Sequence, residues 1–211
     1  MGKIFDINNG FMQGISKIVD CIFLALLWIL CSIPIFTIGA ASSAMYYTFH
    51  KVIREGRGYL LESFFGSFKS SFKQSTIMWI ILLIFYVLNF FGYSILWAMD
   101  VEGYGVTFFM IMQTIVLSFV TICGIYAFAY EARFEDSVKT IIKNSVLLSI
   151  LNFGWSLVLI VIFAFALALA LLVPSLCFVF ITLYNWAASS ILEAVFKKIM
   201  PTEALEEEDE I

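Results

Sequence analysis

The sequence predicts an all-α fold, a polytopic bundle of transmembrane helices. Three observations predict it: 62% of the 211 residues are hydrophobic, only 13% are charged, and the mean hydropathy is +0.99. Soluble domains carry about 25% charged residues. The 23 Phe, 9 Tyr and 5 Trp residues also give the chain more apolar surface than one core can bury. We therefore expect a lipid bilayer to surround most of the protein.

The apolar runs define the expected helices. They predict transmembrane helices near residues 16-33, 36-54, 75-99, 106-130, 146-172 and 175-197. The last apolar run, residues 146–187, is too long for one crossing, because about 20 helical residues span the hydrocarbon core. We divide it near Pro174. Helices are expected throughout, since backbone groups in lipid must be hydrogen-bonded internally.

The segment 18–53 allows two topologies. If it crosses the bilayer once, the protein has five helices, and Lys3 and Lys17 lie outside the cell. If it forms a short hairpin around Pro34, the protein has six helices and both termini are cytoplasmic. The hairpin is preferred, because positively charged segments stay in the cytoplasm. Five crossings are the alternative.

The distribution of Lys and Arg predicts the orientation. Three segments are basic, and they hold Lys51, Arg54, Arg57, Lys69 and Lys73, then Arg133, Lys139 and Lys143, and finally Lys197 and Lys198. Neither residues 100–105 nor the turn at Pro174 has a positive charge. The basic segments are therefore expected to face inward and the two uncharged turns outward.

Residues 60-74 predict a cytoplasmic amphipathic helix. Aromatic and aliphatic residues recur at spacings of three and four, while lysines and serines occupy the other face. Such a helix lies in the membrane interface with its rings toward the acyl chains. The alternative is a docking element for a partner subunit, and in that case Phe64, Phe68 and Lys69 are the expected contacts.

The remaining charged residues are interpreted as follows. Asp20 lies near the start of the first run, where it can pair with Lys17 or reach the interface. His50, Lys51 and Arg54 are expected at the cytoplasmic edge of the membrane. Residues 1-200 form one integral membrane domain. Residues 201-211 are strongly acidic and are expected to be a disordered tail.

Several functions have no support in the sequence. There is no GxxxxGK[ST], GxSxG or HExxH motif, so neither nucleotide binding through a P-loop nor these enzyme classes are indicated. The four cysteines have no CxxC spacing and the chain has one histidine, so no metal, cofactor or redox site is expected. No extended basic patch supports nucleic-acid binding. We expect a protein that is not an enzyme.

Ion-coupled transport is also disfavoured, because carriers of that type usually have buried carboxylates along their pathway. The third to fifth apolar runs offer chiefly the neutral Asn89, Gln113 and Asn152. If the protein is nevertheless a small autonomous solute channel or exporter, these three residues are expected to lie along a continuous polar path.

Three stretches together resemble the YesL-like family, small bacterial membrane proteins classed as a domain of unknown function. They are residues 32–47 (SIPIFTIGAASSAMYY), 63–77 (SFFGSFKSSFKQSTI) and 132–145 (ARFEDSVKTIIKNS). The similarity in spacing extends from residue 5 to about residue 201. The resemblance implies a bacterial cytoplasmic membrane protein with several crossings.

Genes of that family often lie beside those for binding-protein-dependent ABC importers of oligosaccharides and for glycoside hydrolases. The resemblance therefore implies an accessory or assembly subunit whose partner is the permease of a carbohydrate ABC importer. It supplies no catalytic residues. The expected partner contacts in the second inner loop are Arg133, Phe134, Glu135 and Asn144. A membrane-bound regulator or scaffold that acts through the acidic tail is a further alternative.

Overall fold

The computed structural model describes residues 10–98, 103–134 and 136–198, and within these ranges it contains seven α-helices and no strand. The all-α class is confirmed. The helices are α1 (Gly10–Cys31), α2 (Ile38–Thr48), α3 (Leu60–Ala98), α4 (Tyr104–Glu131), α5 (Val138–Leu151), α6 (Phe153–Leu172) and α7 (Cys177–Phe196). Three short elements accompany them, the 3₁₀ turns η1 (Ile35–Thr37) and η3 (Pro174–Leu176) and the π-helix η2 (Phe49–Arg54).

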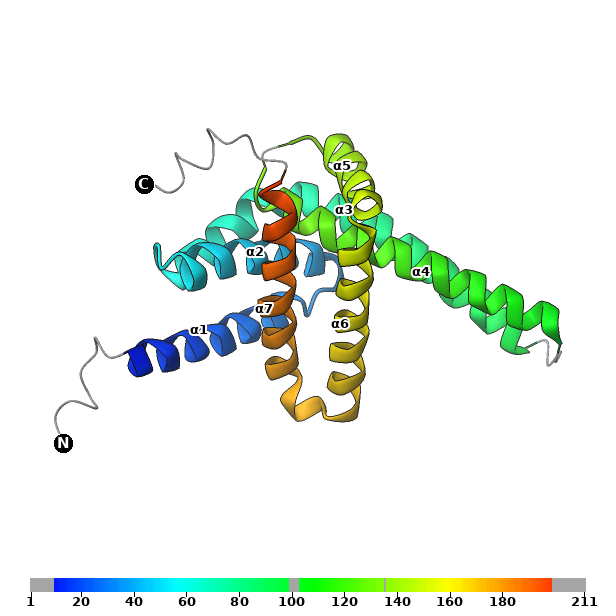
Figure 1. Ribbon diagram of the computed structural model, residues 1–211, viewed down its shortest axis with the longest axis horizontal. Coiled ribbons are helices and arrows are strands. Elements are labelled where there is room, and N and C mark those ends of the chain that lie inside the picture. The colour runs from blue at the N-terminus through cyan, green and yellow to red at the C-terminus, as the bar shows by residue number, and fades with distance from the viewer. Residues whose placement is uncertain (1–9, 99–102, 135, 199–211) are drawn as a thin grey trace.

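Two long helical hairpins diverge from a common base. Figure 1 shows the α3–α4 hairpin extending to the right and the α6–α7 hairpin extending downward. The base between them is built from α1, α2, α5 and the ends of the hairpins. The end of α3 at Ala98, the start of α4 at Tyr104 and the turn η3 at Pro174 are thus at the far ends of the hairpins.

The chain reverses direction between α1 and α2, as the preferred hairpin predicts. Pro34 precedes η1, and the Thr37 hydroxyl donates to the carbonyls of Cys31 at 2.5 Å and Pro34 at 2.6 Å. The two helices then pack antiparallel, and Trp28 Nε1 donates to Ser42 Oγ at 3.1 Å.

Helix α2 is the central helix of the structure. Eight of its eleven residues are buried, and it contacts α1, α3 and α4. Small side chains let these helices approach closely. Gly39 lies so near α3 that a Cβ atom there would be 2.6 Å from the Ser75 carbonyl oxygen.

We predicted that residues 36-54 form one helix that crosses the membrane in contact with lipid. In the structure, α2 is shorter than that and is covered mostly by other helices. The eleven residues of α2 and the six of η2 are together shorter than the ~20 residues that one crossing needs. Protein rather than lipid covers most of α2. Six crossings therefore stay a prediction.

Helix α3 joins two segments that we predicted as separate helices, 60-74 and 75-99. It continues through Gln74 and Ser75 because neither proline nor glycine occurs between residues 67 and 91. With 39 residues it is about 58 Å long, nearly twice the ~30 Å hydrocarbon core. Only part of α3 can therefore cross a bilayer in an upright orientation.

The opposite difference occurs near Asn152. We predicted one helix over 146-172, but α5 ends at Leu151 and α6 begins at Phe153. Asn152 has a non-helical backbone (φ −110°, ψ 43°), and Ser156 Oγ donates to the Ser149 carbonyl at 2.8 Å across the break. Asn and Ser side chains that bond to nearby backbone groups compete with the helical pattern.

Two buried clusters hold the base together. One combines α3, α4, α5 and α7 around Tyr126, Ile141 and Leu192. The other combines α1, α2 and the start of α3 around Leu24, Phe49 and Phe64. Helix α7 joins the two, because Leu192 belongs to the first cluster and Ile181 packs against the second.

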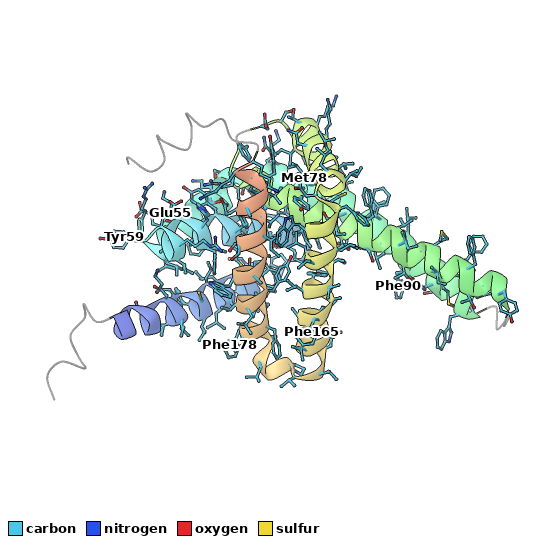
Figure 2. All side chains as sticks on the ribbon, viewed as in Figure 1. Glu55, Tyr59, Met78, Phe90, Phe165 and Phe178 are labelled. Carbon is cyan, nitrogen blue, oxygen red and sulfur yellow. The ribbon has the colours of Figure 1, made fainter. Side chains whose placement is uncertain are left out.

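Among the described residues, four helices are long and apolar enough to cross a membrane, namely α3, α4, α6 and α7. Their apolar surfaces are largely uncovered. No residue is buried in the most apolar 18-residue stretch of α3, and in α7, the best covered of the four, 28% is buried. Phe90 on α3 and Phe165 on α6 are 68% and 65% exposed, on separate hairpins (Figure 2). Such surfaces belong in lipid or against other apolar helices.

Candidate functional site

A buried polar cluster lies where α2, η2, α7 and the segment after α4 meet. Glu193 of α7 is at its centre. Its Oε1 atom accepts a hydrogen bond from Tyr46 at 2.7 Å. Its Oε2 atom lies 3.2 Å from His50 Nε2 and 3.3 Å from Arg133 Nη2. The side chains of Glu193, Arg133 and His50 are only 5%, 11% and 13% exposed. One carboxylate therefore links three segments that are remote in the sequence.

The cluster extends to the turn after η2. His50 Nδ1 lies 3.0 Å from Glu55 Oε1 and 3.5 Å from Arg133 Nη1. Arg57 approaches Glu55 from the solvent side at 3.9 Å. The π-helix places His50 here, because its wider turn changes the direction of side chains relative to an α-helix. Such π-helical turns are frequent at functional sites.

Tyr46 is held in its neutral form by this environment. Burial raises the pKa of its hydroxyl well above the ordinary value, because the phenolate would lose its hydration. The Glu193 carboxylate raises the pKa further, both as a neighbouring negative charge and as the acceptor of the hydroxyl hydrogen bond. Tyr46 thus acts as a hydrogen-bond donor.

A second polar cluster, centred on Glu131, lies beside the first, at the end of α4. Ser43 of α2 donates to Glu131 Oε2 at 3.0 Å, and Ser75 of α3 donates to the same oxygen. Ser43 also lies 3.0 Å from the Phe128 carbonyl oxygen. The other carboxylate oxygen of Glu131 is buried and has no hydrogen-bond partner among the described residues. Glu131 therefore joins α2, α3 and α4 at one level of the structure.

A groove of about 1080 Å³ adjoins the two polar clusters. Its walls come from the end of α2, the first part of α3 and the segment between α4 and α5. Cationic and anionic side chains both line it, together with tyrosines and serines. The charged residues among them are Lys51, Glu62, Lys73, Glu131, Arg133 and Asp136.

Two of the predicted contact residues lie inside the protein. Arg133 points into the polar cluster, where it pairs with Glu193. Phe64 is fully buried and stacks on the ring of Phe68 with centroids 6.2 Å apart. Phe68 itself packs partly against the cluster of α1 and α2. Arg133 and Phe64 therefore hold helices together within this chain.

The other predicted contacts are more accessible. Phe134 lines the groove and packs between Tyr130 and Phe196, at centroid distances of 4.5 and 5.9 Å. Asn144 donates to the Tyr130 hydroxyl at 2.9 Å and is half-buried. Lys69 is exposed on α3. Glu135 lies outside the described residues, as does the acidic tail 201-211.

The four residues predicted at the membrane interface have different surroundings in the structure. His50 belongs to the buried polar cluster rather than to an exposed membrane edge. Lys51 lines the groove, donates to the Tyr47 hydroxyl at 3.0 Å and lies 5.2 Å from the centre of that ring. Arg54 is exposed and donates to Ser190 of α7. Asp20 is half-buried on α1.

The neutral polar residues of the spans bond both within their own helix, as Asn89 does to the Phe85 carbonyl, and between neighbouring helices. Tyr86 of α3 donates to Thr121 of α4 at 3.2 Å, and a Cβ atom on Gly92 would collide with the amide of Gln113. Asn152 belongs to the α5–α6 break instead, beside Ser149, which contacts Cys123 of α4. Cys123 follows Gln113 by ten residues, about 15 Å along a helix. Asn152 therefore lies well apart from Gln113.

Four residues of these two clusters were not predicted as site residues, namely Glu193, Glu131, Tyr46 and Ser43. A signal for Glu193 was present, because it is the only acidic or basic residue in the predicted helix 175-197 before its final lysine. Ionisable residues inside such helices mark functional or structural sites. Within the described ranges, no group of three or more His, Cys, Asp or Glu side chains is arranged to hold a metal ion.

This fold, with four apolar spans and a polar base, is that of a helical membrane protein. The family model described as "Protein of unknown function, DUF624" matches residues 21–93, which run from within α1 through α2 to within α3. No curated protein and no solved structure matches the chain. Residues 21–93 are thus similar to a family of unknown function, while the resemblance to the YesL-like family stays a prediction.

Proposed function

We propose that the protein is a non-enzymatic accessory or assembly subunit that binds another integral membrane protein. The observation that carries the proposal is the uncovered apolar surface of the two diverging hairpins. A channel or carrier that works alone must surround a path with its own helices. Here each hairpin instead presents most of its apolar surface outward, where helices of a partner can pack by close van der Waals contact.

The charges of the spans support the same proposal. In α4, α6, α7 and the part of α3 from Ser75 onward, the acidic and basic side chains are Glu131 and Glu193. Both are engaged in contacts between helices at the base. An autonomous ion-coupled carrier usually has such groups along its pathway. The separation of Asn152 from Gln113 likewise disfavours an autonomous solute channel.

The groove offers a second contact surface for the partner. With the basic segments in the cytoplasm, the base and the groove lie on the cytoplasmic side, and both termini are cytoplasmic. Lys73 and Lys69 on α3 and Phe134 after α4 are the contacts proposed there. The permease of a bacterial carbohydrate ABC importer is the proposed partner, on the basis of the family resemblance. A regulator or scaffold acting through residues 201-211 is the remaining alternative.

Photo-crosslinking in the native membrane tests this proposal. We expect a photoreactive residue in place of exposed Phe90 or Phe165 to capture another integral membrane protein, identified by mass spectrometry. The matched control is Met78, which lies on the same helix as Phe90 but is only 2% exposed, and it should capture none.

The possible products separate the parts of the proposal. An ABC permease supports the whole proposal. A different membrane protein supports the subunit role and contradicts the importer. Lipid adducts alone at both exposed positions contradict the subunit role itself.

A further inference from the structure

His50 bridges two carboxylates that belong to different parts of the structure. Its Nδ1 atom lies 3.0 Å from Glu55 in the turn after η2, and its Nε2 atom lies 3.2 Å from Glu193 on α7. His50 is the single histidine of the chain. We call the Glu55–His50–Glu193 contact the His50 bridge.

The chemistry of the ring makes this bridge dependent on a proton. A neutral imidazole has one N–H donor and one lone pair, whereas an ionised carboxylate only accepts hydrogen bonds. Both contacts of His50 are therefore hydrogen bonds only when both ring nitrogens carry a proton. In either neutral tautomer, one carboxylate oxygen faces a nitrogen lone pair.

Charged groups from several elements surround the ring. The titratable and charged groups around it come from α2, η2, the following turn, the segment after α4, and α7, and they are Tyr46, Arg54, Glu55, Arg57, Arg133 and Glu193. Arg133 alone contacts His50 as a cation, against two carboxylates.

Loss of the proton affects the two carboxylates unequally. Glu193 keeps its contacts with Tyr46 and Arg133. The ion-pair contact that remains to Glu55 among the described residues is with Arg57, at 3.9 Å. Glu55 is followed by Gly56 and Gly58, whose φ angles are +70° and +79°, and Gly58 and Tyr59 line the groove. Figure 2 shows Glu55 and Tyr59 at that end of the structure.

We propose that the His50 bridge is a proton-sensitive device that controls the edge of the groove. With His50 protonated, the turn at residues 55–59 is held against α7. As the pH rises and His50 loses its proton, the contact with Glu55 is lost and the turn separates from α7. The inference does not depend on the identity of any partner.

Hydrogen exchange of the full chain in lipid nanodiscs tests the bridge. Exchange at the amides of residues 55–59 is measured across a pH series and corrected for intrinsic exchange, while ring NMR signals report the protonation of the single histidine. We expect protection to fall about tenfold as the ring loses its proton, because the turn then loses a hydrogen bond to a charged group.

Two variants and one control make the result specific. His50→Gln cannot donate to both carboxylates, so protection should be low at every pH. Glu55→Gln can accept from or donate to Nδ1, so protection should stay high at every pH, and as a partly exposed residue Glu55 tolerates this change. Glu62→Gln, on the same groove but outside the bridge, should keep the pH dependence of the unmodified chain. Protection that is independent of pH in the unmodified chain, or pH dependence that persists in either bridge variant, overturns the proposal.

Discussion

The Glu193→Ala variant is expected to lose about 3–5 kcal/mol of its free energy of unfolding. The substitution removes the carboxylate that Arg133, His50 and Tyr46 all contact, and it leaves the largely buried guanidinium of Arg133 without this ion pair. Buried charges without a partner are far more costly than exposed ones. Unfolding by SDS titration in mild detergent, followed by tryptophan fluorescence, measures the loss.

Two comparisons show whether the loss arises from the polar cluster. Glu62→Ala removes an exposed carboxylate from α3 and should change the stability by no more than about 0.5 kcal/mol. The double variant Glu193→Leu, Arg133→Met removes both charges of one pair, and it should be more stable than Glu193→Ala. A Glu193→Ala chain within about 1 kcal/mol of the unmodified protein means that Glu193 is not the centre of this cluster.

The Gly39→Ala variant is expected to lose about 1–3 kcal/mol, because its added methyl group has no space. A Cβ atom there would be 2.6 Å from the Ser75 carbonyl oxygen, 2.7 Å from Trp79 Cβ and 3.1 Å from the Phe128 ring. Backbone and Cβ atoms cannot rotate away, so α2 must move from α3. The same SDS titration measures this effect.

Gly66→Ala provides the matched comparison, since no atom lies within 4 Å of a Cβ atom at that position. Gly66 is inside α3, where alanine is the better helix former by up to about 1 kcal/mol. The two variants should therefore change the stability in opposite directions. Equal effects at the two positions contradict the close packing of α2 on α3.

The sequence predicts the fold class and most of the long helices because both depend on apolar run length. The runs at 106-130 and 175-197 correspond to α4 and α7, and the break at Pro34 is where α1 turns toward α2. Composition alone does not distinguish a helix covered by lipid from one covered by protein. For this reason the crossing predicted for residues 36-54, where α2 is short and surrounded by other helices, stays a prediction.

The two wrong helix boundaries have a common physical cause. A change from polar to apolar residues at Gln74 was interpreted as the end of a helix, but α3 continues because nothing interrupts its backbone hydrogen bonds. Conversely, the apolar run around Asn152 conceals a real break, which depends on side-chain bonds of Asn152 and Ser156. Local hydrogen bonding decides both boundaries, and hydropathy does not report it.

Only two residues of the polar cluster were noted from the sequence. His50 and Arg133 were noted as charged residues next to apolar runs, and both were expected at the surface. Their common partner Glu193 is 143 residues from His50 and 60 from Arg133, so no local spacing connects them. Folding brings them together because α7 packs across the base beside α2 and the end of α4.

The central claim is that the outer parts of both hairpins lie in lipid while the turn at Tyr59 lies outside the hydrocarbon core. Spin labels on Phe90→Cys, Phe165→Cys and Tyr59→Cys, each in a chain whose four native cysteines are replaced by alanine, test it directly in reconstituted bilayers. The relative access of oxygen and of a water-soluble nickel complex reports the depth of each label. We expect labels 90 and 165 to be within the hydrocarbon region and label 59 to be accessible from water. Water access at position 90 or 165 equal to that at position 59 would contradict the claim.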